Sequence, residues 1–321
     1  MKAIWITWEH HRRTREIARS LDLRLLELTS RRGVPWKYVS LLGRTTLYLL
    51  KARPTHLFVQ CPSVILGLWA VLMQPLFGYV LVADLHNEAV EPFVNRSSLF
   101  RWMLRRLQRN ANLSLVTNRA LASLVEANGG RPFVLPDRVP ILQSAPNKDY
   151  SNVPYTVVFV CTFALDEPYR EVIEATRSLV DVATVHVTGG FDVEDWSGSV
   201  PQNLRFSGYL PDVAYEDLLR RSDVVVDLTA MEDCLVCGGY EAVALEKPLV
   251  TSDTRALRAC FSRGTVFTRH DSTSIAAAIK DALNRRDELG HEMTLLRRDL
   301  EAAWEARKPV LMTQLEALAA K

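Results

Sequence analysis

Acidic side chains on either side of a glycine pair are the residues of this sequence best suited to chemistry. Asp233 and Glu241 are eight positions apart, and Gly238-Gly239 lies between them. Backbone amides at a glycine turn and at the start of a helix bind phosphate groups, while a carboxylate accepts hydrogen bonds from sugar hydroxyls. The spacing therefore suits a ligand with both groups, such as a nucleotide. A simpler interpretation is that Glu241 only offsets the positive end of a helix dipole.

The elements that must position these residues are predicted in the order strand, loop, helix, strand. A valine-rich run at 223–228 predicts a strand buried on both faces, and 249–251 predicts a second one. The loop at 229–233 closes at the glycine pair, and a helix is expected to begin at Tyr240 and to end at Lys247-Pro248. This order is typical of the βαβ unit of a nucleotide-binding sheet.

An acid and an imidazole follow another predicted strand, at 79–83, and form a candidate catalytic group. Asp84 and His86 are two positions apart, so they point to the same side if the strand continues through them. Asp84 could then orient His86, and His86 could meet a hydroxyl near the reacting carbon. Glu9, in the loop after the first predicted strand at 2–7, is the third member. The alternative is a capping aspartate beside a structural histidine.

The loop after the first strand carries bulk and charge. Residues 8–13 are Trp-Glu-His-His-Arg-Arg, where a dinucleotide-binding loop would have glycines. This argues against a dinucleotide-dependent oxidoreductase. Taken by itself, the cluster of histidines and arginines is a solvated basic turn.

The composition is that of a globular protein with two domains. A chain of 321 residues, 48% hydrophobic and 24% charged, is long enough for two separate cores. No secretory signal is expected, because residues 1–6 lead directly into a strand. The five cysteines are odd in number, which indicates a reducing, cytoplasmic compartment. Cys234 and Cys237 form a CxxC pair, but no second pair completes a zinc site, and no metal is expected.

The net charge of +2 hides an asymmetry along the chain. Residues 1–150 carry 21 Lys and Arg against 10 Asp and Glu, hence +11, and residues 151–321 carry 18 against 27, hence −9. Opposite signs suggest two domains with different roles, the first of which faces something anionic. Since no nucleic-acid-binding module is evident, an anionic membrane surface or a phospholipid-linked acceptor fits better than nucleic acid.

Two further patterns bear on membrane association. The apolar runs at 64–73 and 76–82 are separated by Gln74-Pro75, so the uninterrupted part is shorter than the roughly 20 residues that span a bilayer. A buried helix followed by a strand is expected there. A helix at 98–110 has an arginine-rich face, which suits an interfacial helix on anionic lipid or an ordinary surface helix docked by its apolar face.

The stretch from 233 to 250 resembles the donor-sugar motif of glycosyltransferase family 4 and related GT-B enzymes. An acid, seven residues, a glutamate, a small-residue helix, Lys-Pro and a valine-rich strand follow one another in the family's order. The matching positions are Glu241, Ala242, Ala244, Lys247, Pro248 and Val250. The family usually has glutamate at the first acid, where this chain has Asp233. The resemblance is good over 203–253 and weak over the rest of the chain.

The resemblance implies an α/β chain of the GT-B fold, with two Rossmann-like doubly wound domains facing across a cleft. Residues 1–150 would bind the acceptor and residues 151–321 the nucleotide sugar, with the last helix returning to the first domain. The implied reaction moves a sugar from a nucleotide-diphosphate donor to a lipid-linked or saccharide acceptor, with retention at the anomeric carbon and no cofactor or metal. The basic first domain suggests surface polysaccharide or glycolipid synthesis at the inner face of a bacterial membrane.

The resemblance places the donor contacts mainly on the second domain, and also suggests that the basic first loop faces a phosphate. The implied donor-binding residues are Glu241, Asp233, Gly238, Gly239, Tyr240, Thr162, Gly189 and Arg170. In the family, the loop after the strand at 155–161 supplies an arginine and a lysine to the diphosphate, but 162–168 contain no base here. Either Arg170, Lys247, Arg255 or the first-loop arginines substitute, or the donor is bound differently, or catalysis is lost.

Two other classes of function therefore stay open. One is a non-catalytic partner subunit that keeps the fold, which the missing phosphate bases favour. The other is a nucleotide-sugar epimerase of the GT-B fold, which needs acid–base groups on the donor side and no acceptor. The positively charged first half of the chain favours a transferase.

Overall fold

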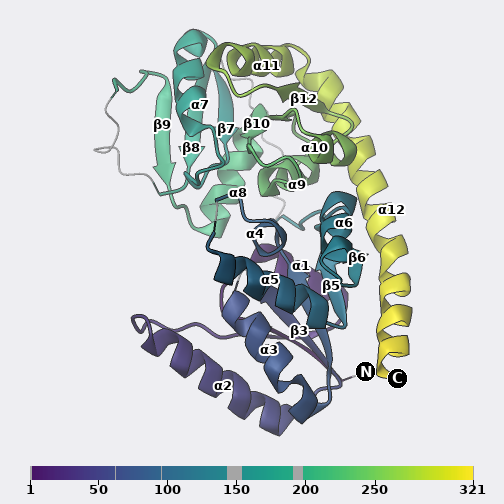
Figure 1. Cartoon of the computed structure of the whole chain (residues 1–321). Helices are drawn as coiled ribbons and strands as arrows, with labels where there is room; N and C mark the ends of the chain where they lie inside the picture. Colours follow the sequence, from purple (N-terminus) through teal and green to yellow (C-terminus); the bar gives the residue numbers. More distant parts are fainter. Residues whose placement is uncertain (1, 62, 95, 143–153, 191–197, 321) are drawn as a thin grey trace. The chain divides into compact units, whose positions relative to one another are not determined.

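Two parallel sheets account for the strands of the chain (Figure 1). The computed structural model describes residues 2–61, 63–94, 96–142, 154–190 and 198–320. These residues form two compact units, one consisting of Met1–Arg138 with Ala303–Lys321 and the other of Val139–Ala302. The predicted domain boundary between residues 150 and 151 lies outside the described residues.

The sheet of the first unit has the order β2-β1-β3-β4-β5-β6, with every pair of neighbours parallel. Its strands are β1 (Ala3–Thr7), β2 (Arg24–Glu27), β3 (His56–Cys61), β4 (Val80–Leu85), β5 (Leu113–Val116) and β6 (Pro132–Val134). The strand order reverses between β1 and β3. In open α/β sheets, ligands bind at the carboxyl ends of the strands where such a reversal occurs.

Helices cover both faces of this sheet because side chains alternate along its buried strands. The helices of the unit are α1 (Arg12–Ser20), α2 (Trp36–Ala52), α3 (Val64–Phe77), α4 (Asn87–Val90), α5 (Ser98–Asn110) and α6 (Arg119–Ala127). Ile4 and Ile6 face α2, α3, α5 and α6 in one core. Trp5 stacks on Phe58 at 5.2 Å in the other core, which α1 and the C-terminal residues complete.

The sheet of the second unit has the order β12-β11-β10-β7-β8-β9 and is also parallel throughout. Its strands are β7 (Tyr155–Phe159), β8 (Ala183–Thr188), β9 (Leu204–Gly208), β10 (Val224–Asp227), β11 (Leu249–Ser252) and β12 (Thr265–Thr268). Here the order reverses between β7 and β10. This is the strand order of a dinucleotide-binding sheet.

Helices also cover both faces of the second sheet. They are α7 (Tyr169–Thr176), a 3-10 turn (Arg177–Leu179), α8 (Asp212–Arg221), α9 (Cys237–Ala244), α10 (Arg255–Cys260), α11 (Ser272–Asn284) and α12 (Arg286–Ala319). Val157 and Val226 face the core that contains α7 and α11. Val158 and Val225 face the core that contains α8, α9 and α10.

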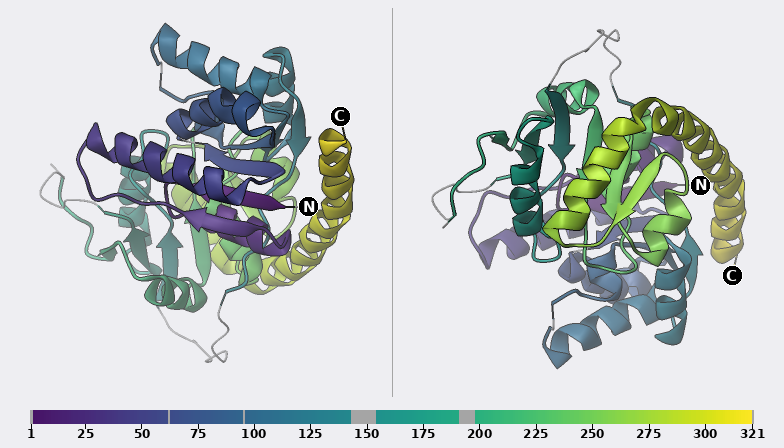
Figure 2. Two further views of the ribbon diagram at one scale, coloured as in Figure 1. Left: turned by 90° about the horizontal axis from the view of Figure 1, so that it is seen from below. Right: turned by 90° about the horizontal axis from the view of Figure 1, so that it is seen from above.

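Two expectations about helices were wrong. The sequence after the helix expected at 274–283 predicts two more helices, but the structure has one, α12, which contains Pro309 and runs unbroken in Figure 2. Its residues 303–319 belong to the first unit, where Trp304, Leu311 and Leu315 are buried. Helix α3 continues through Pro75 to Phe77 instead of stopping at Gln74. Among the residues described, no helix is both long and apolar enough to cross a membrane.

Candidate functional site

Glu241 of the donor motif lies at the carboxyl edge of the second sheet, beside the point where the strand order reverses. Glu241 is 6% exposed, and its carboxylate accepts a short hydrogen bond from the Tyr215 hydroxyl of α8. Burial and the neighbouring Glu241 raise the pKa of Tyr215 well above its usual value, so Tyr215 stays a donor. Helix α9 begins at Cys237, not at Tyr240 as predicted, and Glu241 therefore lies in its second turn rather than its first.

Gly238 and Gly239 lie in the first turn of α9 and do not form the end of the preceding loop as predicted. The Gly238 amide donates to Asp227 Oδ2 at 2.7 Å. A Cβ at Gly238 would lie 2.6 Å from that oxygen, and a Cβ at Gly239 would lie 2.6 Å from the Phe261 ring. Packing inside the second unit therefore requires both glycines, and one of the amides predicted to hold phosphate is bonded within the chain.

Asp227 is a functional candidate that the sequence did not single out. It ends β10 at the point where the strand order reverses, and it is 6% exposed. Burial and, after it, the nearby Glu167 raise the pKa of Asp227 well above its usual value, although the Gly238 amide opposes the shift. The protonated form of Asp227 is thus favoured relative to that of an exposed aspartate. The only hint in the sequence was an acid at the end of a run of valines.

The loop after β7 holds a carboxylate where the family has bases. Glu167 Oε2 accepts hydrogen bonds from the amides of Thr162 at 2.8 Å and Ala164 at 2.9 Å, and Glu167 Oε1 accepts one from the Thr162 hydroxyl at 3.0 Å. Phe163 has a φ of 60°, a left-handed conformation that turns the loop around this carboxylate. The loop after β10 is hydrogen-bonded to this loop, because the Thr229 hydroxyl donates to Asp166 Oδ2 at 2.6 Å. Thr162, a predicted donor contact, thus bonds to Glu167.

The structure places the other predicted donor residues as follows. Asp233 forms an ion pair with Arg255 at 3.3 Å. Tyr240 is 3% exposed and packs edge-on against Phe261, so it occupies a core position. Gly189 has a φ of 85°, and a Cβ there would lie 2.2 Å from Cys161 O. Arg170 is exposed, and its guanidinium lies 5.4 Å from the centre of the Tyr169 ring.

One proposed substitute for the missing bases is in the wrong place. Lys247 precedes β11 and interacts with Asp223, which precedes β10, so it lies at the amino edge of the sheet. It cannot reach a ligand at the carboxyl edge. At that edge, the acidic side chains of Asp166, Glu167 and Glu241 lie close enough to Asp227 to raise its pKa. Within the described ranges, no three His, Cys, Asp or Glu side chains are grouped as a metal site would require.

In the first unit, Asp84 is fully buried and binds a buried arginine. Arg13 Nη2 donates to Asp84 Oδ1 at 3.0 Å and to Leu135 O at 2.9 Å, and Arg13 Nη1 pairs with Asp137. Burial alone would raise the pKa of Asp84, but Arg13 and His86 outweigh it, and the net pKa is lowered. Arg13 therefore neither faces a phosphate nor lies in a solvated turn, the two roles expected for the first-loop arginines.

His86 lies beside this ion pair and beside a second histidine. Its Nε2 is 3.6 Å from Asp84 Oδ2, and its ring contacts His11 edge-on at 4.5 Å. Strand β4 ends at Leu85, and His86 caps α4, so the alternation expected through both residues stops before His86. Burial, followed by His86, lowers the pKa of His11 to about 4. Both rings have a buried nitrogen without a hydrogen-bond partner, namely His86 Nε2 and His11 Nδ1.

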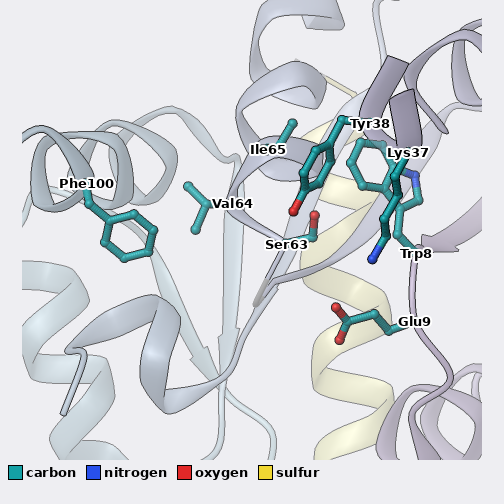
Figure 3. Close-up of a pocket in the computed structure, with 8 residues that line it drawn as sticks. All are labelled: Trp8, Glu9, Lys37, Tyr38, Ser63, Val64, Ile65 and Phe100. Carbon is teal, nitrogen blue, oxygen red and sulfur yellow. The ribbon is translucent and has the colours of Figure 1, made fainter. Parts of the chain in front are cut away.

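A pocket of the first unit lies where β1 and β3 end, which is the reversal point of this sheet (Figure 3). It has a volume of about 180 Å³ and is lined by Trp8, Glu9, Lys37, Tyr38, Ser63, Val64, Ile65 and Phe100. Glu9 thus belongs to this pocket. The Trp8 indole is held by a hydrogen bond to the Thr45 hydroxyl at 3.1 Å and lies 6.2 Å from the Tyr38 ring. Aromatic walls with a carboxylate and an ammonium group suit a ligand that has both apolar and hydroxyl faces.

Comparison with known proteins identifies the fold. No protein-family model and no curated protein matches the chain. Sucrose-phosphate synthase from Thermosynechococcus elongatus is similar with a TM-score of 0.73 and 14% identity, over 100% of both chains. HepE from Anabaena, in complex with UDP and glucose, gives 0.71 and 12%, over 94% of this chain and 95% of that one. This is the GT-B fold.

The same fold extends to a different activity. A putative UDP-N-acetylglucosamine 2-epimerase from Listeria monocytogenes has a TM-score of 0.58 and 14% identity, over 91% of this chain and 82% of that one. The GT-B fold by itself therefore does not separate transferase from epimerase. The side chains at the two reversal points must decide between them.

Proposed function

We propose that this GT-B chain is a glycosyltransferase with a nucleotide-diphosphate sugar as donor. The observation that carries the proposal is the buried Glu241 carboxylate, held by Tyr215 at the reversal point of the second sheet. A buried carboxylate at this edge is suited to accept hydrogen bonds from ribose hydroxyls. Similar structures that contain UDP and UDP-glucose support this assignment. Within the fold we place the chain nearest to family 4, as a retaining enzyme that needs no metal.

The pocket of the first unit is our candidate acceptor site. Trp8, Tyr38 and Phe100 offer ring faces for a sugar, and Glu9 offers a carboxylate for its hydroxyls. His86, whose Nε2 lies 3.6 Å from Asp84 Oδ2, is the candidate proton acceptor. We propose a lipid-linked or saccharide acceptor in bacterial surface polysaccharide or glycolipid synthesis, at the cytoplasmic face of the membrane.

Calorimetric titration with UDP, GDP, ADP and their sugar conjugates tests the donor site. One nucleotide is expected to bind, and Glu241→Gln should weaken it roughly tenfold or more, since a hydrogen bond to a charged group contributes about 1.5–3 kcal/mol. Gln keeps an acceptor for Tyr215, so the variant should fold. Glu174→Gln, an exposed change in the same unit, is the control. Equal binding by wild type and Glu241→Gln would exclude this site.

A second candidate function is a non-catalytic partner subunit, and Glu167 is the observation that favours it. Its carboxylate occupies the amides of the loop that should receive a diphosphate, and no base lies in 162–168. A folded chain that binds no nucleotide would support this alternative. A chain that binds a nucleotide sugar and converts the sugar to an isomer without an acceptor would be an epimerase.

A further inference from the structure

Helix α2 of the first unit carries large apolar side chains on its outer face. Trp36, Val39, Leu47 and Leu50 are 66%, 57%, 61% and 51% exposed. Their spacing places all four on one stripe of the helix, because 3.6 residues make a turn. Val34, just before the helix, is 73% exposed. Single exposed apolar residues are ordinary, but a continuous stripe of this length marks an interaction surface.

The stripe has no role in the core of the first unit. The opposite face of α2 fills that role, since Leu41, Thr45 and Leu49 are fully buried. Trp8 donates to Thr45 on this inner face. The helix is therefore apolar on two opposite sides, and the described residues bury only one of them.

The charges around the stripe have one sign. The segment from Thr29 to Arg53 contains six bases and no acid, and the bases are Arg31, Arg32, Lys37, Arg44, Lys51 and Arg53. Lys37, Arg44 and Lys51 fall on one flank of the stripe, since they are seven positions apart. All six except the half-buried Lys37 are exposed.

The neighbouring helices also expose large apolar side chains. Helix α3 packs against both α2 and α5, as Figure 1 shows. It exposes Leu72 and Leu76 at 69% and 75%, while α5 exposes Leu99 and Trp102 at 66% and 52%. Leu99, Met103 and Leu107 were expected to dock α5 by its apolar face. Leu107 is fully buried and Met103 packs on the core, as expected, whereas Leu99 is exposed.

We propose that the outer face of α2, with Arg31 and Arg32, docks this protein on an anionic lipid bilayer. An apolar stripe flanked by bases is what an interfacial helix presents to acyl chains and headgroups. Each base near an anionic surface contributes attraction, whereas two copies of this chain paired through α2 would bring twelve bases together. Charge therefore favours lipid over a second copy as the occupant.

The functional reason for this docking rests on the proposed lipid-linked acceptor, but the test of the docking does not depend on that function. Lys37 and Tyr38 come from the same helix and line the pocket of the first unit. A docked α2 would thus hold that pocket close to the lipid headgroups. A lipid-linked substrate could then reach the pocket without leaving the bilayer.

Vesicle flotation measures the docking directly, with phosphatidylcholine vesicles that contain or lack phosphatidylglycerol. Wild type should float only with the anionic vesicles. The triple variant Val39→Ser, Leu47→Ser, Leu50→Ser should reduce the partition coefficient by about tenfold or more, because the removed side chains no longer bury apolar area. The control is Val213→Ser, Val310→Ser, which changes two exposed apolar residues (70% and 58%) outside this surface.

Two further experiments, one on charge and one on oligomeric state, complete the test. Arg31→Glu with Arg32→Glu should also abolish flotation, whereas Arg269→Glu in the second unit should not. Binding of the triple variant at wild-type strength would overturn the inference, as would a wild type that ignores anionic vesicles. A wild-type dimer in lipid-free sedimentation that the triple variant converts to monomer would assign the face to a second copy instead. Nucleotide titration of the same variants separates this outcome from failure of the proposed function, because α2 and Glu241 belong to different units.

Discussion

At the scale of single residues, the first unit depends on a charge that has been removed from water. Arg13 is 5% exposed and meets Asp84, Asp137 and Leu135 O, so its donors have acceptors from two separate parts of the chain. Such pairs contribute little net stability but are costly to break, because the remaining partner stays buried and charged. Asp84 in turn lies next to His86, the candidate catalytic histidine.

Replacing Arg13 by Met should destabilise the first unit by about 3–5 kcal/mol, because Asp84 would be left as an uncompensated buried charge. Denaturant unfolding measures the loss. The exposed Arg19→Met in the same helix is the control and should change stability by less than about 0.5 kcal/mol. A loss for Arg13→Met as small as the control's would mean that Asp84 is not ionised.

The stability of the first unit should fall as the pH drops from 6.5 toward 4, because of His11. Its pKa is lowered from 6.5 to about 4 in the folded state, so the unfolded state takes up a proton first in that range. Glutamine at position 11 cannot titrate, and His11→Gln should show a smaller decrease in melting temperature over the same range. Asp84 acts at lower pH: because its pKa is lowered in the folded state, its protonation reduces the stability only as the pH falls below its usual pKa of 3.8. Parallel melting curves for wild type and His11→Gln would contradict the assignment.

Glu167→Gln should strengthen the binding of nucleoside diphosphates, by about tenfold, because it removes a like charge from the loop that faces the diphosphate. Glutamine can still accept the amide hydrogen bonds of Thr162 and Ala164. Glu171→Gln in α7 is the matched control. Titration with a nucleoside and with its diphosphate separates the two parts of the ligand, since only diphosphate binding should change. Weaker diphosphate binding would mean that Glu167 organises the loop for the donor.

At the scale of secondary structure elements, the apolar runs at 2–7, 79–83, 155–161, 223–228 and 249–251 predicted β1, β4, β7, β10 and β11, since buried parallel strands are short apolar runs. The sequence did not predict where α9 begins, because packing against Asp227 and Phe261 draws the glycine pair into the helix. It also could not show that Arg13 reaches Asp84 and Asp137, which are 71 and 124 positions away. The sequence also did not predict that Glu167 binds the amides of its own loop. These contacts are local, but a glutamate before a proline has no distinctive pattern.

Two glycines in helices should respond to alanine with opposite signs. Gly239→Ala should destabilise the second unit by about 1–3 kcal/mol, because its Cβ would lie 2.6 Å from the buried Phe261 ring. Gly290→Ala in α12 should stabilise it by about 0.5–1 kcal/mol, since its Cβ meets nothing closer than 3.4 Å and alanine favours the helix. Thermal unfolding compares the two. A neutral Gly239→Ala would mean that Phe261 moves aside readily.

At the scale of the whole molecule, the first unit is completed by residues distant in sequence. Trp304, Leu311 and Leu315 of α12 cover the face of the first sheet that holds Trp5 and Phe58. His56 in β3 contacts Leu315 O at 3.0 Å, and Arg138 lies 5.6 Å from the Trp304 ring. Composition and charge predicted two domains, and the resemblance implied a last helix that returns to the first of them. The three-dimensional structure shows which side chains of that helix enter the first core.

Leu311→Ala should destabilise the first unit by about 2–5 kcal/mol, as expected for a fully buried leucine. Hydrogen exchange of peptides from β1 and β3 reports on this unit separately from the second. Val310→Ala, at a position 58% exposed on the same helix, is the control and should change little. Faster exchange in β10 or β11 instead would mean that the helix acts mainly on the second unit.

The contribution of residues 303–319 to the first core has a consequence for synthesis on the ribosome. Residues 1–138 are translated first, yet the face of their sheet that α1 covers only in part stays incomplete until Leu311 and Leu315 leave the exit tunnel. At roughly 5–20 residues per second, that delay lasts on the order of ten seconds or more. The unit made from 139–302 can close first, although it is translated second. During that interval Trp5 and Phe58 are the side chains that a nascent-chain chaperone would meet.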